Sequence, residues 1–136
     1  MPDISDIILM DVSKILPHSY EKFCVCISSS SKYFYINSLH REMYDDFEIK
    51  SSDYGFLKHD SHVGCHKAHL LGDELVIRKI GKLNRKDMMK ILNKIKNSKH
   101  LPKAEKESVS CELEEWLNNC QENKLNDFTI LQPTGL

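Results

Sequence analysis

The side chains best suited to chemistry are concentrated in one stretch, residues 53–69, which reads DYGFLKHDSHVGCHKAH. It contains four of the seven histidines of the chain, with a carboxylate, a hydroxyl and a thiol among them: His59, His62, His66, His69, Asp60, Ser61 and Cys65. Histidine moves protons near neutral pH because its ordinary pKa lies there. The stretch therefore predicts acid–base chemistry, phosphate binding or metal binding.

A metal site is one alternative for this stretch. The four histidines follow one another at spacings of three, four and three residues, with Cys65 between them. Zinc ligands must converge on one point, however, and on a strand His62 and Cys65 would point to opposite faces. No Cys-x-x-Cys pair supports zinc, so we expect neither a metal nor another cofactor. A nucleophilic Cys65 beside a histidine is a further alternative.

The segments that must position these groups begin with short strands. Apolar runs rich in β-branched and aromatic residues predict an antiparallel hairpin, and two further strands follow. The predicted strands are Phe23–Ile27, Tyr33–Ile36, Phe47–Ile49 and Glu74–Arg78. Residues 1–16 fit either a helix or a strand.

Two helices are expected after the strands. Asn84 is a good N-cap with Asp87 three residues later, and the apolar stripe Met88, Ile91, Leu92 and Ile95 predicts a helix over about 84–98. A second stripe predicts another helix, formed by Val109, Leu113, Trp116, Leu117 and Cys120. Residues Asp127–Leu131 could add a short edge strand or an ordered tail. Strands followed by helices are typical of α+β proteins.

The charge pattern is strongly asymmetric although the formal net charge of the 136 residues is only −1. Residues 76–103 carry ten Lys or Arg and one acid, a balance of +9, whereas residues 104–127 carry seven acids and two lysines, a balance of −5. This split suggests two mutually attracting faces, or a basic surface that binds a polyanion. We expect no membrane span and no signal peptide, and the odd number of cysteines favours a reduced, cytoplasmic protein.

Two short motifs resemble the MazF/PemK-like family of toxin–antitoxin modules. They are the segment FLKHDSHVGC at 56–65 and the segment RKIGKLNRKDM at 78–88, whose Ile80–Leu83 turn opens the predicted helix. The hairpin end Ile36-Asn37-Ser38 is similar to the second long strand of the family. The resemblance covers residues 15–98 as an order of elements, and it identifies the chain as a divergent member.

The resemblance implies an α+β fold with a small SH3-like, MazF-type β-barrel followed by C-terminal helices. The barrel domain and its helix would occupy residues 1–101, and an acidic helical extension packed on the barrel would occupy 102–136. The implied activity is endoribonucleolytic: metal-free cleavage of single-stranded RNA by attack of the 2′-hydroxyl. The implied partners are RNA, a cognate antitoxin protein and a second copy in a homodimer.

Metal-free RNA cleavage needs a base, an acid and cations for the charge that develops on phosphorus. Our candidates for the catalytic roles are His18, Lys22, Ser38, His59, Asp60, Ser61 and His62. The histidines would transfer protons, Asp60 would orient one of them, and the serines and Lys22 would hold the phosphate. RNA contacts are expected from Arg41, Lys58, Arg78, Lys79 and Lys82, beside a basic helix. Each histidine could equally be a solvated loop residue.

A non-catalytic binding module for a protein or nucleic-acid partner is the alternative function. The family's Arg-Pro before the first long strand is absent, and Gly64-Cys65-His66 stands where the PemK branch has Arg-Cys-Asp. These differences favour the binding module, whereas the histidine-rich stretch favours an enzyme. The acidic helix could pack as structure, form a dimer interface or lie over the basic surface as a lid.

Overall fold

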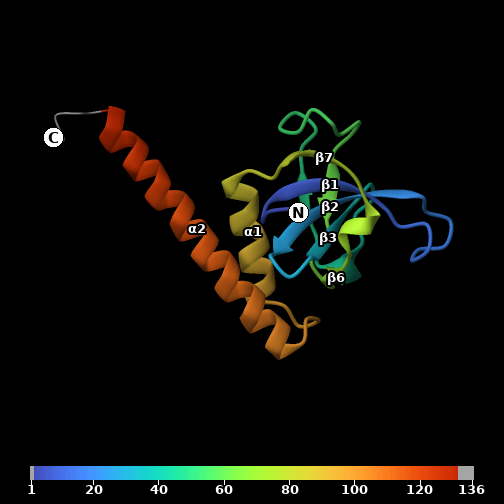
Figure 1. Cartoon of the computed structure of the whole chain (residues 1–136). Helices are drawn as coiled ribbons and strands as arrows, with labels where there is room; N and C mark the ends of the chain where they lie inside the picture. The colour runs from blue at the N-terminus through green and yellow to red at the C-terminus, as the bar shows by residue number, and fades with distance from the viewer. Residues whose placement is uncertain (1, 132–136) are drawn as a thin grey trace.

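The computed structural model describes residues 2–131, with side chains described through Asn119, and shows an α+β protein (Figure 1). Its strands are β1 (Asp6–Asp11), β2 (Glu21–Ser28), β3 (Lys32–Asn37), β4 (Phe47–Ile49), β5 (Ser61–Val63), β6 (His69–Leu70) and β7 (Val76–Lys82). Two 3₁₀ turns, η1 (Glu42–Tyr44) and η2 (Asp73–Leu75), and two helices, α1 (Arg85–Lys96) and α2 (Lys103–Leu131), complete the order. The predicted α+β class is confirmed.

The strands form one antiparallel sheet in the order β4-β5-β3-β2-β1-β7, with β6 on the first half of β3. The sheet does not close: β4 and β7 are its terminal strands within the described chain. The predicted hairpin is β2 with β3, in the register Cys24↔Tyr35 and Val25↔Phe34. The predicted strand Phe47–Ile49 is β4.

The structure completes or changes the sequence expectation in three segments. The ambiguous N-terminal segment forms strand β1, which lies between β2 and β7 and is buried on both faces, as its continuous apolar run Ile7–Met10 requires. The strand expected at Glu74–Arg78 starts two residues later, because η2 takes Asp73–Leu75 and pairing with β1 extends β7 to Lys82. Residues Asp127–Leu131 lie within α2 and form no strand.

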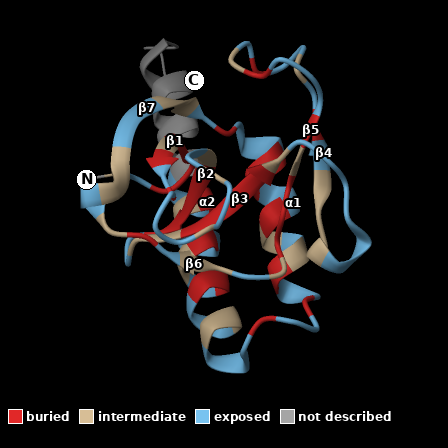
Figure 2. Cartoon of the chain, turned by 90° about the vertical axis from the view of Figure 1, so that its right-hand side faces the viewer, coloured by how far each residue is buried: buried red, intermediate tan, exposed pale blue. Residues whose placement is uncertain are grey.

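One face of the sheet is covered by the helices (Figures 1 and 2). The Asn84 side chain accepts a hydrogen bond from the Asp87 backbone N–H at 2.8 Å, so the predicted N-cap of α1 is confirmed. The buried side of α1 and the first half of α2 pack with the strand residues in one apolar cluster. Its helical members include Met88, Ile91, Ile95, Val109, Leu113 and Leu117. The described residues of both predicted stripes therefore belong to the core that the helices form with the sheet, and Cys120 of the second stripe lies outside the described side chains.

A buried tyrosine ties the histidine-rich stretch to the start of α1. Tyr54 Oη donates to Asp87 Oδ2 at 2.5 Å and accepts from the Asn84 backbone N–H at 3.0 Å. Burial, reinforced by the hydrogen bond to Asp87, raises the pKa of Tyr54. The loop that follows Tyr54 is consequently fixed at one end before it enters β5.

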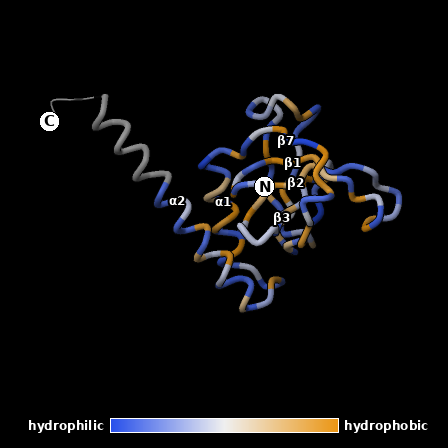
Figure 3. Tube along the Cα trace, in the orientation of Figure 1, coloured by the Kyte–Doolittle hydropathy of each residue, from blue (hydrophilic) through white to orange (hydrophobic). Residues whose placement is uncertain are grey.

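The other face of the sheet has a smaller apolar cluster, which includes Ile8, Met10, Cys24, Cys26, Tyr33, Tyr35 and Leu71. Apolar positions gather in the central strands, while the connecting loops are largely polar (Figure 3). The described side chains of α1 and α2 pack with the first cluster and not with this one. Within the part of the chain that the structure describes, no helix combines the length and apolarity needed to cross a bilayer.

Candidate functional site

Two side chains from the loop between β3 and β4, His40 and Asp46, converge on His62, the middle residue of β5. His40 Nδ1 lies 2.5 Å from Asp46 Oδ1. The imidazole rings of His40 and His62 have centroids 5.7 Å apart at an interplanar angle of 50°. The arrangement is a carboxylate, an imidazole that it orients, and a second imidazole beside the first.

Strand β5 sets the direction of His62. Ser61 and Val63 are buried, and Val63 belongs to the core beneath the helices, so the side chain of His62 points to the opposite face. His62 is paired with Asn37 of β3 on one side and with Glu48 of β4 on the other. This pairing places the ring at the surface of the helix-free face, between two polar neighbours.

The loop between β3 and β4 delivers the other two groups. Asp45 adopts the left-handed conformation (φ 49°), which aspartate tolerates better than most residues, and it closes η1 just before Asp46. The Asp46 carboxylate accepts hydrogen bonds from His40 and from the Arg41 backbone N–H at 3.1 Å. The side chain of Asp46 is only 1% exposed, whereas that of His40 is 62% exposed. A buried acceptor thus holds an accessible imidazole.

A row of polar side chains crosses the sheet beside this cluster. The register of β2 with β3 pairs Cys24 with Tyr35, and continuing it by two residues sets Lys22 opposite Asn37, which itself pairs with His62. Residues opposite each other in antiparallel strands share a face. Lys22 lies on the helix-free face, with Nζ 5.4 Å from the ring centroid of Tyr35. Burial lowers the pKa of Lys22.

The central residues of the predicted catalytic set occupy different environments. Asp60 accepts hydrogen bonds from the backbone N–H and hydroxyl of Ser51, at 2.8 and 3.1 Å, rather than from a histidine. His59 is exposed and its Nδ1 lies 3.0 Å from the Asp60 carbonyl oxygen. Ser61 is buried and donates to the His59 carbonyl at 3.1 Å. These three residues shape the entry to β5, and the carboxylate beside His62 is Asp46.

The remaining predicted loop residues are exposed. His18 lies in the β1–β2 loop with a φ of 65°, Ser38 follows the end of β3, and Lys58 precedes β5. Arg41 contributes its backbone N–H to Asp46, and its guanidinium lies 5.9 Å from the ring centroid of Tyr44. Ser38 and Arg41 belong to the loop that carries His40, and both residues are exposed there.

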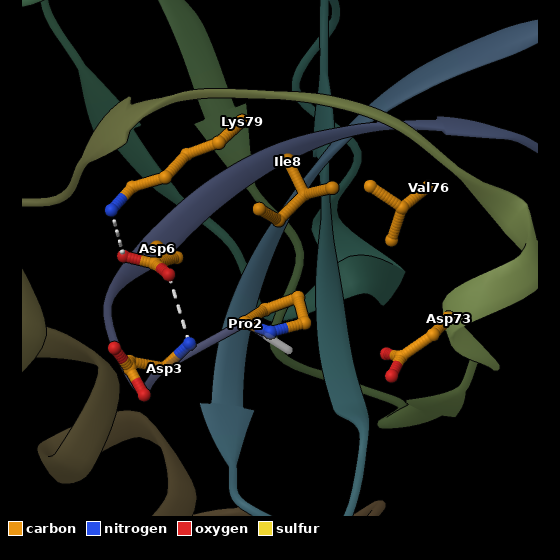
Figure 4. Close-up of a pocket in the computed structure, with 7 residues that line it drawn as sticks. All are labelled: Pro2, Asp3, Asp6, Ile8, Asp73, Val76 and Lys79. Carbon is orange, nitrogen blue, oxygen red and sulfur yellow. Dashed lines mark hydrogen bonds and ion pairs between the residues drawn. The ribbon is translucent and has the colours of Figure 1, made fainter.

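The predicted RNA-binding residues of β7 lie elsewhere. Strands β3, β2 and β1 stand between β5 and β7, and Arg78, Lys79 and Lys82 are exposed on this terminal strand. The buried Asp6 carboxylate lies 3.2 Å from Lys79 Nζ and 3.5 Å from Lys82 Nζ. Asp6 lines a pocket of about 350 Å³. Figure 4 shows its carboxylate between Asp3 and Lys79. The charges of Lys79 and Lys82 are thus partly neutralised.

Two histidines of the stretch are packed against tyrosines. His66 stacks on Tyr44 with ring centroids 4.6 Å apart, and His69 stacks on Tyr35 at 3.7 Å. Burial lowers the pKa of His66, and burial together with the positive charge of Lys67 lowers the pKa of His69 to about 4. Both rings favour the neutral form, which suits packing better than proton donation.

The His69 stack predicts a specific dependence of stability on pH. Because the pKa of His69 is about 4 in the folded chain and 6.5 in its ordinary state, the unfolded chain binds more protons between those values. The free energy of unfolding should therefore fall as the pH is lowered from 6.5 towards 4. Urea unfolding at several pH values should show this slope, and His69→Phe, which keeps an aromatic ring beside Tyr35, should reduce it. An unchanged slope in the variant would contradict the assignment.

Sequence reasoning missed His40, Asp46 and Asn37 as members of the site. His40 and Asp46 are six residues apart in a polar loop that carries no motif, and each residue type is common in loops. The usable signal was the position of this loop between two predicted strands, since loop residues at neighbouring strand ends can meet. Only the pairing of β4 and β3 with β5 brings that loop against His62.

Comparison with known proteins adds no assignment to this geometry. A scan against protein-family models finds no match, and a search of curated proteins finds no significant relative.

Proposed function

We propose that the protein is an endoribonuclease that cleaves single-stranded RNA without a metal, by attack of the ribose 2′-hydroxyl on the adjacent phosphorus. The observation that carries the proposal is the convergence of two imidazoles and a buried carboxylate at the His40–Asp46–His62 cluster. Such a set supplies both proton transfers that the reaction needs.

The two imidazoles take complementary roles. His40 donates its Nδ1–H to Asp46, which leaves Nε2 to accept the proton of the 2′-hydroxyl, while the carboxylate stabilises the imidazolium that forms. The 2′-oxygen then bonds to phosphorus as the bond from phosphorus to the 5′-oxygen breaks. His62, in its protonated form, gives a proton to the departing 5′-oxygen. The products are a 2′,3′-cyclic phosphate and a 5′-hydroxyl.

The row of polar side chains beside the cluster would stabilise the negative charge on the phosphoryl oxygens. Neighbouring strands are about 4.8 Å apart, so Lys22 on β2 lies about 10 Å from His62 measured between Cα atoms. A lysine side chain covers much of that distance, and the Asn37 amide lies between the two. Arg41, beside His40, is a second cation for a neighbouring phosphate. Substitution of Lys22 would remove a cation that stabilises the phosphate and would leave both proton-transfer groups in place.

The MazF/PemK resemblance agrees with this proposal and extends it. We infer an SH3-like arrangement of the strands, an antitoxin protein that covers the site, a homodimer and a cytoplasmic setting. These inferences rest on the motifs at 56–65 and 78–88 and on the order of strands followed by a helix. Each of these inferences can be tested without measuring RNA cleavage.

A non-catalytic binding module is the second candidate. The observation in its favour is the separation of the basic β7 residues from the histidine cluster by three strands, and the pairing of Lys79 and Lys82 with Asp6. In that case the exposed charges would serve a partner rather than guide RNA to a reaction centre.

The deciding experiment is incubation of single-stranded RNA with the purified protein in excess EDTA, followed by analysis of the product ends. We expect fragments with 2′,3′-cyclic phosphate and 5′-hydroxyl ends. Fragments with 5′-phosphate and 3′-hydroxyl ends would contradict the mechanism. Intact RNA in the presence of folded protein would favour the binding module.

A further inference from the structure

We propose that the His40–Asp46–His62 cluster is also a binding site for a divalent transition-metal ion of the zinc type. The proposal concerns binding alone and does not depend on ribonuclease activity. It differs from the zinc site considered for the histidine-rich stretch, because only His62 is shared. His59, His66, His69 and Cys65 are not part of this cluster.

The ligand atoms are close enough to meet one ion. One donor atom from each of the three residues lies within 4.8 Å of the other two. A tetrahedral zinc with bonds of about 2.0–2.1 Å needs ligand atoms about 3.4 Å apart. His40 can supply most of the required movement, because its side chain is 62% exposed and belongs to a loop.

The buried carboxylate is already oriented as metal ligands usually are. Asp46 Oδ2 accepts the Arg41 backbone N–H, which leaves Oδ1 directed towards His40. Hydrogen bonds of this kind orient ligands in metal sites and add to their affinity. A cation bound between Oδ1 and Nδ1 would displace the proton from Nδ1, and the neutral ring of His40 would carry that proton on Nε2 instead.

The donor set selects the class of ion. Two imidazole nitrogens and one carboxylate oxygen suit Zn²⁺, Co²⁺, Ni²⁺ or Cu²⁺, whereas Mg²⁺ and Ca²⁺ prefer oxygen ligands. Three protein ligands leave a position for water on the exposed side of His40. Glu48, which is paired with His62 across the strands, is bound by Lys50 at 2.6 Å and is not available as a fourth ligand without breaking that ion pair.

The test uses the full chain after removal of metal, with Zn²⁺ titrated by calorimetry and Co²⁺ followed by absorption. We expect one ion per chain, a Kd in the micromolar range or tighter, and a Co²⁺ spectrum without a thiolate charge-transfer band. Zn²⁺ should also raise the unfolding temperature, because the unfolded chain lacks the assembled site. Mg²⁺ should do neither.

Variants assign the ligands. His62→Gln and Asp46→Asn should each weaken Zn²⁺ binding at least about tenfold. His59→Gln, which alters an exposed histidine three residues before His62, and Cys111→Ser, which removes an exposed thiol, should leave it unchanged. Circular dichroism in EDTA establishes that each variant is folded. Absence of binding, or equal binding by His62→Gln and the unmodified chain, would overturn the proposal.

Discussion

His62→Gln is expected to lower the rate of RNA cleavage by about 10²–10⁴-fold, the usual contribution of one general acid or base. Glutamine keeps a polar side chain of similar reach but cannot transfer a proton. His62 is half-buried on β5, between Asn37 and Glu48. Glu48 forms its ion pair with Lys50 and not with His62. The loss should therefore appear in the rate of the chemical step and leave the free energy of unfolding nearly unchanged.

The matched control for this variant is His59→Gln. Both histidines belong to the histidine-rich stretch, but His59 is exposed and lies outside the His40–Asp46–His62 cluster. His59→Gln should retain nearly full activity. Because His40 and His62 act on the same reaction, the double variant His40→Gln/His62→Gln should be little worse than either single variant. Equal losses in His59→Gln and His62→Gln would point to a site built on the stretch itself.

Removal of residues 103–136 is expected to prevent folding. Val109, Leu113 and Leu117 of α2 are buried in the cluster that joins the sheet to α1. Burying each such side chain contributes about 1.5–3 kcal/mol, and a domain of this size is stable by only about 5–15 kcal/mol in total. A polar anchor would be lost as well, since Glu112 accepts hydrogen bonds from the Ser28 hydroxyl and the Ser29 backbone N–H, both at 2.7 Å.

Thermal unfolding followed by circular dichroism would measure this effect. A chain that ends at residue 119 retains the three apolar residues and should unfold cooperatively, whereas a chain that ends at residue 102 should show no cooperative transition. Cooperative unfolding of the shorter chain would show that α2 is a dispensable extension.

This prediction also decides how the acidic-lid hypothesis can be tested. Deleting residues 104–136 would remove core side chains together with the acids, so a change in RNA binding could reflect unfolding. Glu105→Gln and Glu114→Gln are better probes, because these acids pair with Lys32 and Lys96 at the surface at 3.1 and 2.5 Å. Tighter RNA binding by the folded variants would support a lid.

Local sequence patterns were sufficient for the β2–β3 hairpin, for β4 and for the two helices. The β2–β3 hairpin and α1 with its Asn84 cap depend on neighbours within a few residues, through side-chain alternation, i to i+4 spacing and one side-chain hydrogen bond. The N-terminal segment was ambiguous because a local pattern cannot distinguish a buried strand from a buried helix when every position is apolar. Ile7–Met10 is apolar at every position, and only its place between β2 and β7 makes it a strand.

For the candidate site, the sequence by itself determined that histidines are concentrated at residues 59–69. It could not determine which of them would meet a carboxylate, because His40 and His62 are separated by 22 positions and are joined only through strand pairing. Tertiary structure decided that Asp46, not Asp60, lies beside the imidazoles, and that His66 and His69 are packed on tyrosines. The physical reason is that burial, stacking and convergence are properties of strand order and sheet face, and residue type and spacing alone do not encode them.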